Sequence, residues 1–369
     1  MSVIRLLKKH TVLCIATFAA IVTCFFVPPS IEYIGYFDFK TLSCLFLTLA
    51  VVCALRNIKF FTILARRIVM LTGNLRMLAL ALVYITFIGS MLIANDMALI
   101  TFLPLGYFAL SVTKQEKYMA YIFILQNISA NLGGMLTPFG NPQNLYLYSY
   151  FEIPTAEFMG IMLPPFVLAV AMLTACCLFL KAVPLAISEG FPEKLNKKRT
   201  VLYLILFAFS LLIVFRGIPY WVGLIIIPII LFFADRDALK AVDYPLLLTF
   251  VMFFIFAGNM SKIDAVNVLA SSLLEKSTLL VSTLSCQIIS NVPSAILLSQ
   301  FTENYHDLLL GVNIGGVGTL ISSLASLITF REYVKHNPGK ASYYIGMFSL
   351  FNFGFLIVLT LFMMIIKMV

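Results

Sequence analysis

The chain has 369 residues, of which 62% are hydrophobic and 11% are charged, and its mean hydropathy is +1.03. A soluble domain of this length could not bury so much apolar surface, so the composition predicts an all-α polytopic membrane protein. In a soluble protein the net charge of +9 would suggest a nucleic-acid partner. Here Lys and Arg gather in particular loops, the bias that orients membrane proteins, and no nucleic-acid partner is expected.

The seven cysteines and three histidines lack the spacing of a metal or redox site. The cysteines fall in apolar segments, which favours packing roles, and the histidines fall near segment ends. We expect no cofactor and no metal other than Na⁺. A membrane-embedded enzyme would need clustered His, Asp or Cys side chains at one membrane face, so no enzyme is expected.

The first apolar run, residues 11–27, begins a series of nine predicted spans. Basic residues Arg5, Lys8 and Lys9 precede it and place the N-terminus in the cytoplasm. The second span, about residues 39–55, returns the chain to the cytoplasmic side. Residues 57–72 then mix basic and apolar side chains at helical spacing, which predicts an amphipathic helix in the membrane interface.

Residues 78–112 are apolar but are interrupted by Asn95 and Asp96. Basic residues flank both ends, so the segment crosses the membrane an even number of times or not at all. Each arm is short for a full crossing. We therefore favour a re-entrant hairpin with its tip near mid-membrane, and two short ordinary spans are the alternative.

The next segment, residues 118–147, is predicted to cross outward as a broken helix, and residues 158–180 return inward. Residues 188–200 are polar and basic, which marks a boundary between two halves. The first half is thus residues 1–187, followed by a cytoplasmic linker and connecting span over residues 188–216.

The second half, residues 217–369, repeats the order of the first. Spans are predicted at residues 219–234 and 244–258, then a second interfacial helix at 262–276. A second hairpin, residues 277–300, is interrupted around Asn291, and a second broken helix covers residues 308–330. A last span at residues 343–366 leaves the C-terminus outside. The connecting span at residues 201–215 turns this half upside down, which predicts an inverted repeat.

One stretch carries the repeat most clearly. Residues 131–145 and 313–327 align without a gap, and Asn141 and Asn144 fall on Ser323 and Ser326. Glycines and bare amides at membrane depth are tolerated where a broken helix lines a cavity or is buried by protein. Two such breaks indicate the binding site of a secondary transporter. The copies share Asn131/Asn313, Gly133/Gly315, Gly134/Gly316, Thr137/Thr319 and Leu145/Leu327.

Placing both hairpin tips against both breaks gives a centre of amides, hydroxyls and free carbonyls. The alternative is ordinary packing of small residues between membrane helices. The predicted substrate-binding residues are Asn95, Asp96, Thr137, Pro138, Asn141, Asn144, Asn291, Pro293, Ser294, Thr319 and Ser323. The predicted cation-binding residues are Asn95, Asp96, Asn131, Gly133, Gly134, Asn291, Asn313, Gly315 and Gly316.

Asp96 is the acidic residue that this topology places deep in the membrane. Such a carboxylate is costly there, which predicts a proton carrier or a cation ligand, with a helix cap as the alternative. The second half has Val292 at the matching position, so this chemistry is asymmetric. No cationic side chain is predicted at the centre, and anion binding would rest on amides, hydroxyls and helix dipoles.

These residues resemble the signature of the ion transporter superfamily. That group includes divalent-anion/Na⁺ symporters, citrate transporters, arsenite permeases and one class of Na⁺/H⁺ antiporters. The tips resemble most closely the arsenite-permease and citrate-transporter branches, since Asp96 and Val292 stand where the dicarboxylate branch has threonine. The resemblance rests on Gly133, Gly134, Thr137, Pro138, Gly140, Asn141, Pro142 and Asn144, together with both tips.

The resemblance implies an elevator-type secondary transporter, often a homodimer, that moves a small anion coupled to Na⁺ or H⁺. The anion would be a carboxylate or an inorganic oxyanion. Rival functions are Na⁺/H⁺ antiport through Asp96, arsenite-type efflux, and a passive channel. The expected location is the lipid bilayer of the inner membrane, with the N-terminus cytoplasmic and the C-terminus outside.

Overall fold

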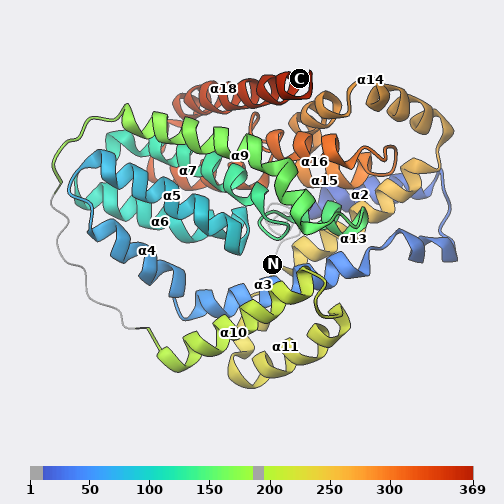
Figure 1. Cartoon of the computed structure of the whole chain (residues 1–369), viewed down its shortest axis with the longest axis horizontal. Helices are drawn as coiled ribbons and strands as arrows, with labels where there is room; N and C mark the ends of the chain where they lie inside the picture. The colour runs from blue at the N-terminus through green and yellow to red at the C-terminus, as the bar shows by residue number, and fades with distance from the viewer. Residues whose placement is uncertain (1–10, 186–194, 369) are drawn as a thin grey trace.

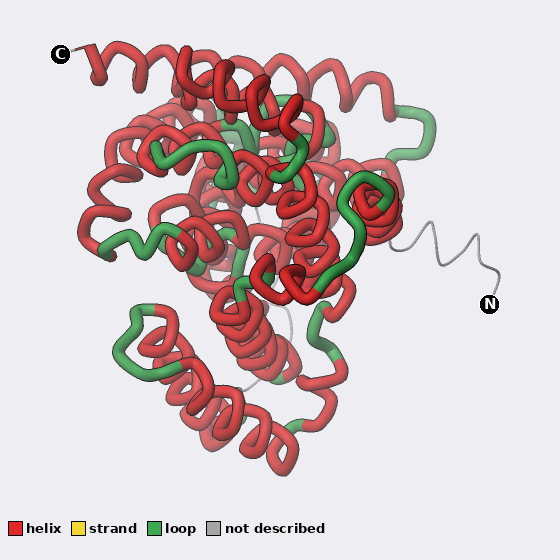
Figure 2. Tube along the Cα trace, turned by 90° about the vertical axis from the view of Figure 1, so that its right-hand side faces the viewer, coloured by secondary structure: helices red, strands yellow, loops and turns green. Residues whose placement is uncertain are grey.

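The structure is a computed structural model that describes residues 11–185 and 195–368. In these residues the chain forms helices and loops, and its one β-bridge pairs Asn74 with Pro184 (Figure 2). The predicted cytoplasmic N-terminal residues Arg5, Lys8 and Lys9 lie outside the described residues. So does most of the polar linker, residues 186–194.

Seven of the described helical segments are long and apolar enough to cross a membrane, which makes the chain a multi-pass membrane protein. Two shorter apolar helices, α2 (Thr11–Cys24) and α11 (Tyr220–Ala234), accompany them. The seven lie in α3 (Phe39–Asn57), α5 (Leu75–Ile93), α6 (Asn95–Val112), α7 (Met119–Gly133) with its flanking turns, α9 (Thr155–Leu178), α13 (Tyr244–Ser261) with the preceding α12 (Arg236–Lys240), and α18 (Ala341–Met368).

The two predicted interfacial helices differ in form. The first is α4 (Phe60–Met70), which follows the 3₁₀ helix η1 (Ile31–Tyr36) and α3 in the chain. The second is not a separate helix: it continues into the next segment as α14 (Asp264–Ile289), bent at Ser277, where φ is −168° and ψ is 99°. The predicted boundary at residue 276 is therefore a kink.

Two helix pairs turn sharply at their predicted tips. Ala94 joins α5 to α6 with φ 66° and ψ 153°, and Ser290 joins α14 to α15 (Asn291–Leu298) with φ 77° and ψ 161°. Non-glycine residues seldom adopt positive φ, so the same strained turn at both tips is an informative match.

The two broken helices are interrupted where the glycine-rich copies lie. In the first, α7 passes through the 3₁₀ turn η3 (Gly134–Leu136), and α8 (Pro142–Tyr150) resumes after Asn141. In the second, α16 (Tyr305–Ile314) ends before Gly315, and α17 (Leu324–His336) resumes after Ser323. The helices resume at corresponding residues of the two copies, Pro142 and Leu324, and the starts of the two breaks differ by one residue.

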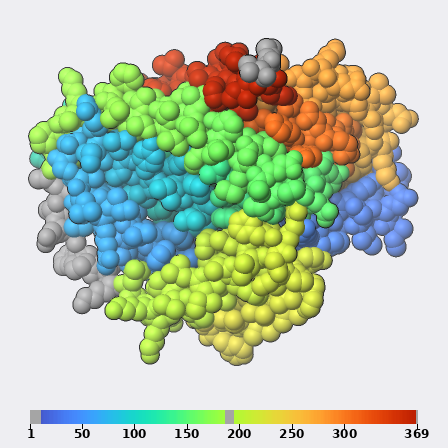
Figure 3. All heavy atoms as spheres, in the orientation of Figure 1, coloured from blue at the N-terminus to red at the C-terminus, as the bar shows by residue number. Residues whose placement is uncertain are grey.

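The packing of the helices is reciprocal between the halves. The second arm of each helix pair lies on the resumed helix of the other half: α6 packs on α17, and α15 packs on α8. Likewise α18 packs on α7, and α9 packs on α16. Figure 1 shows α18 crossing the top of this bundle, and Figure 3 shows α10 (Lys197–Val214) and α11 along its lower edge, where both pack on α3.

Contacts between distant loops join segments that the sequence places on the same side of the membrane. Pairs predicted on the cytoplasmic side are Asn57 with Asp235, Arg76 with the Leu180 carbonyl, and Tyr107 stacked on His336. Pairs predicted outside are Glu32 with Lys262, Glu157 with Tyr305, the Glu152 carbonyl with Arg216, and Asp307 with Lys367. Each of these contacts therefore joins two segments that are predicted to lie on the same side of the membrane.

Candidate functional site

The first hairpin tip lies against the first break. Asn95 is buried and donates from Nδ2 to Asn131 Oδ1 at 3.2 Å, while its own Oδ1 accepts from the Asp96 amide at 2.9 Å. Thr137, inside the break, donates from Oγ1 to the Met91 carbonyl of α5 at 3.0 Å. The tip and the break are therefore held together by three predicted site residues, Asn95, Asn131 and Thr137, and a backbone carbonyl.

The second tip repeats these contacts. Asn291 Oδ1 accepts from the Val292 amide at 2.9 Å, and Thr319 donates from Oγ1 to the Gln287 carbonyl at 3.0 Å. Gln287 precedes the second tip by the same number of residues as Met91 precedes the first. Two of the three contacts at the first tip thus recur at the second with matching atoms and distances.

The Gln287 side chain makes hydrogen bonds to the second break, and no side chain at the corresponding position does so in the first half. Its Nε2 donates to the carbonyls of Gly315 (2.9 Å) and Val317 (3.2 Å), and its Oε1 accepts from the Thr319 amide at 2.9 Å. In the first half the donor to the break is a residue of the broken helix itself: Asn144 Nδ2 donates to three carbonyls of the break. Several backbone groups of both breaks are thus satisfied, but by side chains from different elements.

Three asparagines join the two halves at the centre. Asn313 donates to Asn144 Oδ1 at 2.6 Å and accepts from Asn141 Nδ2 at 3.3 Å. Asn141 Nδ2 also donates to the Asn131 carbonyl at 3.2 Å, and all four residues are buried. A Cβ on Gly316 would lie 3.2 Å from Asn291 Nδ2 and 3.8 Å from Asn131 Oδ1. Amides from both tips and both breaks therefore meet in one buried cluster.

Glycines allow the close approach that this cluster needs. A Cβ on Gly133 would meet the Phe87 carbonyl at 2.4 Å and Ser90 Oγ at 2.6 Å, and a Cβ on Gly315 would meet Cys286 at 2.8 Å. A Cβ on Gly134 would meet Asn141 Oδ1 at 2.4 Å. Both glycine pairs are therefore required by packing and by the position of the amides.

We expect Gly133→Ala to destabilise the fold, because the added methyl would push α7 away from the α5 backbone. Overpacking of this kind costs about 1–3 kcal/mol, and rigid backbone yields less than a side chain. The melting temperature in detergent should fall by several degrees. Gly160→Ala in α9 is the matched control, since no heavy atom lies within 4 Å of its Cβ position. Equal melting temperatures for the two variants would contradict this packing.

Asp96 lies in the first turn of α6, and its carboxylate receives no hydrogen bond from any residue that the structure describes. Its Oδ1 is buried and unpartnered. The Asn95 side chain, not Asp96, accepts the nearby helix N–H. The cap interpretation of Asp96 is therefore not supported by this geometry, and the carboxylate is available to a proton or a cation.

Some predicted site residues lie beside the amide cluster rather than in it. Ser294 bonds Ser285 in the other arm of its own hairpin at 2.9 Å, and Ser323 caps α17 by accepting from the Ser326 amide at 3.2 Å. Pro138 and Pro293 are buried in the break and after the tip, respectively. These serines and prolines hold the helices around the cluster in place, and the asparagines supply its polar groups.

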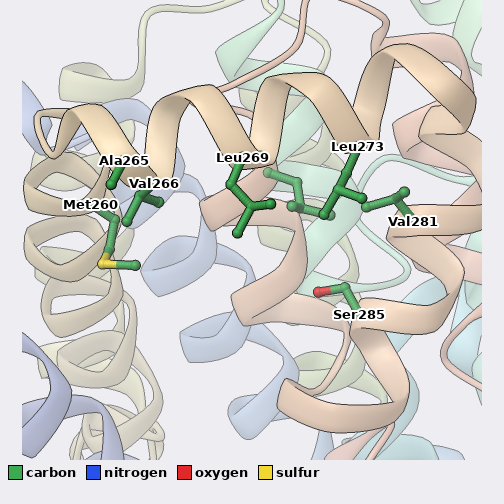
Figure 4. A pocket seen from close by; sticks show the side chains of 9 residues that line it. Met260, Ala265, Val266, Leu269, Leu273, Val281 and Ser285 are labelled. Atoms are coloured by element: carbon green, nitrogen blue, oxygen red, sulfur yellow. The ribbon is translucent and has the colours of Figure 1, made fainter.

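A cavity of about 420 Å³ lies between α14 and α15, under the first half of α14 (Figure 4). Its lining is apolar except for Ser285, whose hydroxyl is already bonded to Ser294. A small anion would find no charged partner among these lining residues. This cavity is therefore not the candidate site.

Sequence reasoning missed two residues beside the tips, Gln287 and Arg56, and one buried amide pair away from them. Gln287 was not distinguished from other polar residues of its arm. Asn127 bonds Asn352 of α18 at 3.4 Å, and both are fully buried. Arg56, at the end of α3, places Nη1 3.3 Å from Met97 Sδ, just beyond the first tip. Only long-range packing brings these residues to their partners, so no local pattern could have indicated them.

A family model described as citrate transporter matches residues 3–305, which include both tips and the first broken helix. An uncharacterized transporter of Methanocaldococcus jannaschii is 32% identical over 300 residues, covering 80% of this chain and 81% of the relative. The inner membrane protein YbiR of Escherichia coli is 31% identical over 286 residues, covering 74% of each chain.

Proposed function

The chain belongs to the citrate transporter family, and we propose that it is a secondary active transporter of a small anion, coupled to Na⁺ or H⁺. The anion is a carboxylate or an inorganic oxyanion. The observation that carries the proposal is the buried cluster in which Asn141 and Asn144 of one half bond Asn313 of the other. A site at the junction of two related halves is the usual arrangement in secondary transporters.

The matched tips and the reciprocal packing support an inverted repeat with two re-entrant hairpins and nine spans. By length alone α5 and α6 could each cross the membrane, but their shared tip stops at the break of α7. We propose that the substrate binds between the tips and the breaks, and that this unit moves as an elevator relative to α3, α10 and α11.

The amide oxygens at the centre fit a partly dehydrated Na⁺. Asn141 Oδ1 is buried and accepts no hydrogen bond from the described residues. Asn131 Oδ1 and, on the first tip, the carboxylate of Asp96 are further oxygen donors. Hard oxygen donors of this kind suit Na⁺, and the free carbonyls of a broken helix complete such sites.

Na⁺/H⁺ antiport is the second candidate, because the unpartnered Asp96 carboxylate could carry a proton across. Arsenite-type efflux fits the same neutral centre.

We propose the inner membrane as the location, with the N-terminus cytoplasmic, the C-terminus outside, and a homodimer as the assembly.

The first experiment measures the melting temperature of the purified protein against citrate, succinate, sulfate, phosphate and arsenite, each with and without Na⁺ and at several pH values. A ligand that binds the folded state raises this temperature by mass action, by an amount equivalent to about 2.7 kcal/mol at 100 times Kd. Stabilisation by an anion supports the proposal. Stabilisation by Na⁺ or Li⁺ alone would replace it with antiport, and stabilisation by arsenite alone would replace it with metalloid efflux.

A further inference from the structure

Arg56 is a basic side chain that reaches a hairpin tip. It lies in the last turn of α3, and its guanidinium contacts Met97, two residues past Asn95. Two other described arginines make contacts away from the tips: Arg66 lies over the Phe108 ring near the far end of α6, and Arg76 bonds the Leu180 carbonyl. The position of Arg56 is therefore distinct from that of an ordinary basic loop residue.

The guanidinium of Arg56 is half-buried and lacks an oxygen partner among the described residues. Its hydrogen-bond contacts are two sulfur atoms, Met97 Sδ at 3.3 Å and Cys53 Sγ at 4.0 Å. Sulfur is a weak acceptor, whereas guanidinium offers five N–H donors that match a carboxylate or oxyanion in a planar fork. This side chain has most of its hydrogen-bonding capacity unused.

Nearby carboxylates are committed to other groups. Asp235 accepts from Asn57 Nδ2, Tyr203 and the Ala238 amide, and Asp243 accepts from the Leu246 amide at the start of α13. Within the described residues no carboxylate oxygen lies within 4 Å of Arg56. An unpaired, half-buried guanidinium that contacts α6 two residues past Asn95 is a natural partner for a diffusible anion.

We propose that Arg56 is the cationic contact for the transported anion, gripping one carboxylate or oxyanion edge from α3 while the amides of the first tip hold the rest. This inference rests on the proposed function and names the residue that recognises the charge. The Asp96 carboxylate lies on the same tip, so the anion binds best when Asp96 is neutralised by a proton or a cation. The anion also links α3 to the hairpin, which ties binding to the relative position of these two elements.

The test uses the full chain in detergent and measures the melting temperature over a concentration series of sodium citrate, sodium sulfate and sodium phosphate at constant ionic strength. The anion that stabilises wild type best is then titrated against four variants. Arg56→Gln should weaken the apparent affinity about 10- to 100-fold, the usual loss for one charged hydrogen-bonding partner. Arg56→Lys keeps the charge but loses the planar fork of donors, so its apparent affinity should lie between those of wild type and Arg56→Gln.

Two variants separate recognition from packing. Arg66→Gln removes the same charge from the same predicted membrane face, where no tip is contacted, and should leave the affinity within about twofold. Met97→Leu removes the sulfur contact but keeps the guanidinium, and should bind like wild type. If Met97→Leu weakens binding as much as Arg56→Gln, Arg56 acts through packing and the inference is overturned.

The remaining outcomes are also decisive. Unchanged affinity in Arg56→Gln overturns the inference while the anion-transport proposal stands. If none of the three anions stabilises wild type, anion transport itself fails and the inference with it. Should Arg56→Gln not fold, Arg56→Lys decides, because an affinity equal to that of wild type would exclude a bidentate role.

Discussion

Asn313→Ala is expected to abolish transport while the protein still folds in detergent. The substitution removes the 2.6 Å bond to Asn144 Oδ1 and one of the two acceptors of Asn141 Nδ2. Each buried group left without a partner costs about 1–3 kcal/mol, so the melting temperature should fall by several degrees. Because the same amides form the proposed binding centre, substrate uptake by proteoliposomes should fall to background.

Asn352→Ala is the matched control for this prediction. Asn352 is as deeply buried as Asn313, and it also bonds an asparagine of a distant helix, Asn127. Its loss should lower the melting temperature by a similar amount, since it leaves a similar group unpaired. Uptake should persist, because neither Asn352 nor Asn127 touches the tips. Wild-type uptake by Asn313→Ala, or equal loss in both variants, would show that the cluster is merely structural.

The centre of the site could be predicted because its signals are local. Glycines and amides inside an apolar run conflict with a plain lipid-facing helix, so the sequence alone predicts helix breaks at residues 131–145 and 313–327. The tips at Asn95 and Asn291 were predicted for the same reason. The structure brings these segments together through Asn131, Asn141 and Asn313.

The rest depends on packing between distant segments. Arg56 stands directly after an apolar run, where a basic residue is expected to set membrane orientation, and its partner Met97 follows 41 residues later. No local sequence pattern distinguishes Gln287, which bonds the second break, from any other polar residue. Helix ends also shifted by a few residues: α10 begins at Lys197 and not at residue 201, because Asn196 accepts from the Arg199 amide and caps it.

Asp96→Asn is expected to uncouple transport from its driving ion. The amide matches the carboxylate in shape but neither carries a proton at neutral pH nor holds a charge for a cation. Accumulation against a gradient should be lost, whether a pH gradient or a Na⁺ gradient drives it in wild type. Exchange of labelled for unlabelled substrate should continue, because the asparagine cluster proposed to bind substrate is intact.

Stability separates this variant from one that is simply damaged. A charged group at membrane depth costs about 3 kcal/mol, and Asp96 Oδ1 receives no compensating bond from the described residues. Asp96→Asn should therefore be at least as stable as wild type, in contrast to Asn313→Ala. Asp237→Asn is the control, since that carboxylate is exposed and its pair with Lys240 contributes little. Gradient-driven accumulation that survives in Asp96→Asn would move the coupling site to the neutral amides, where Na⁺ and not H⁺ would be the driving ion.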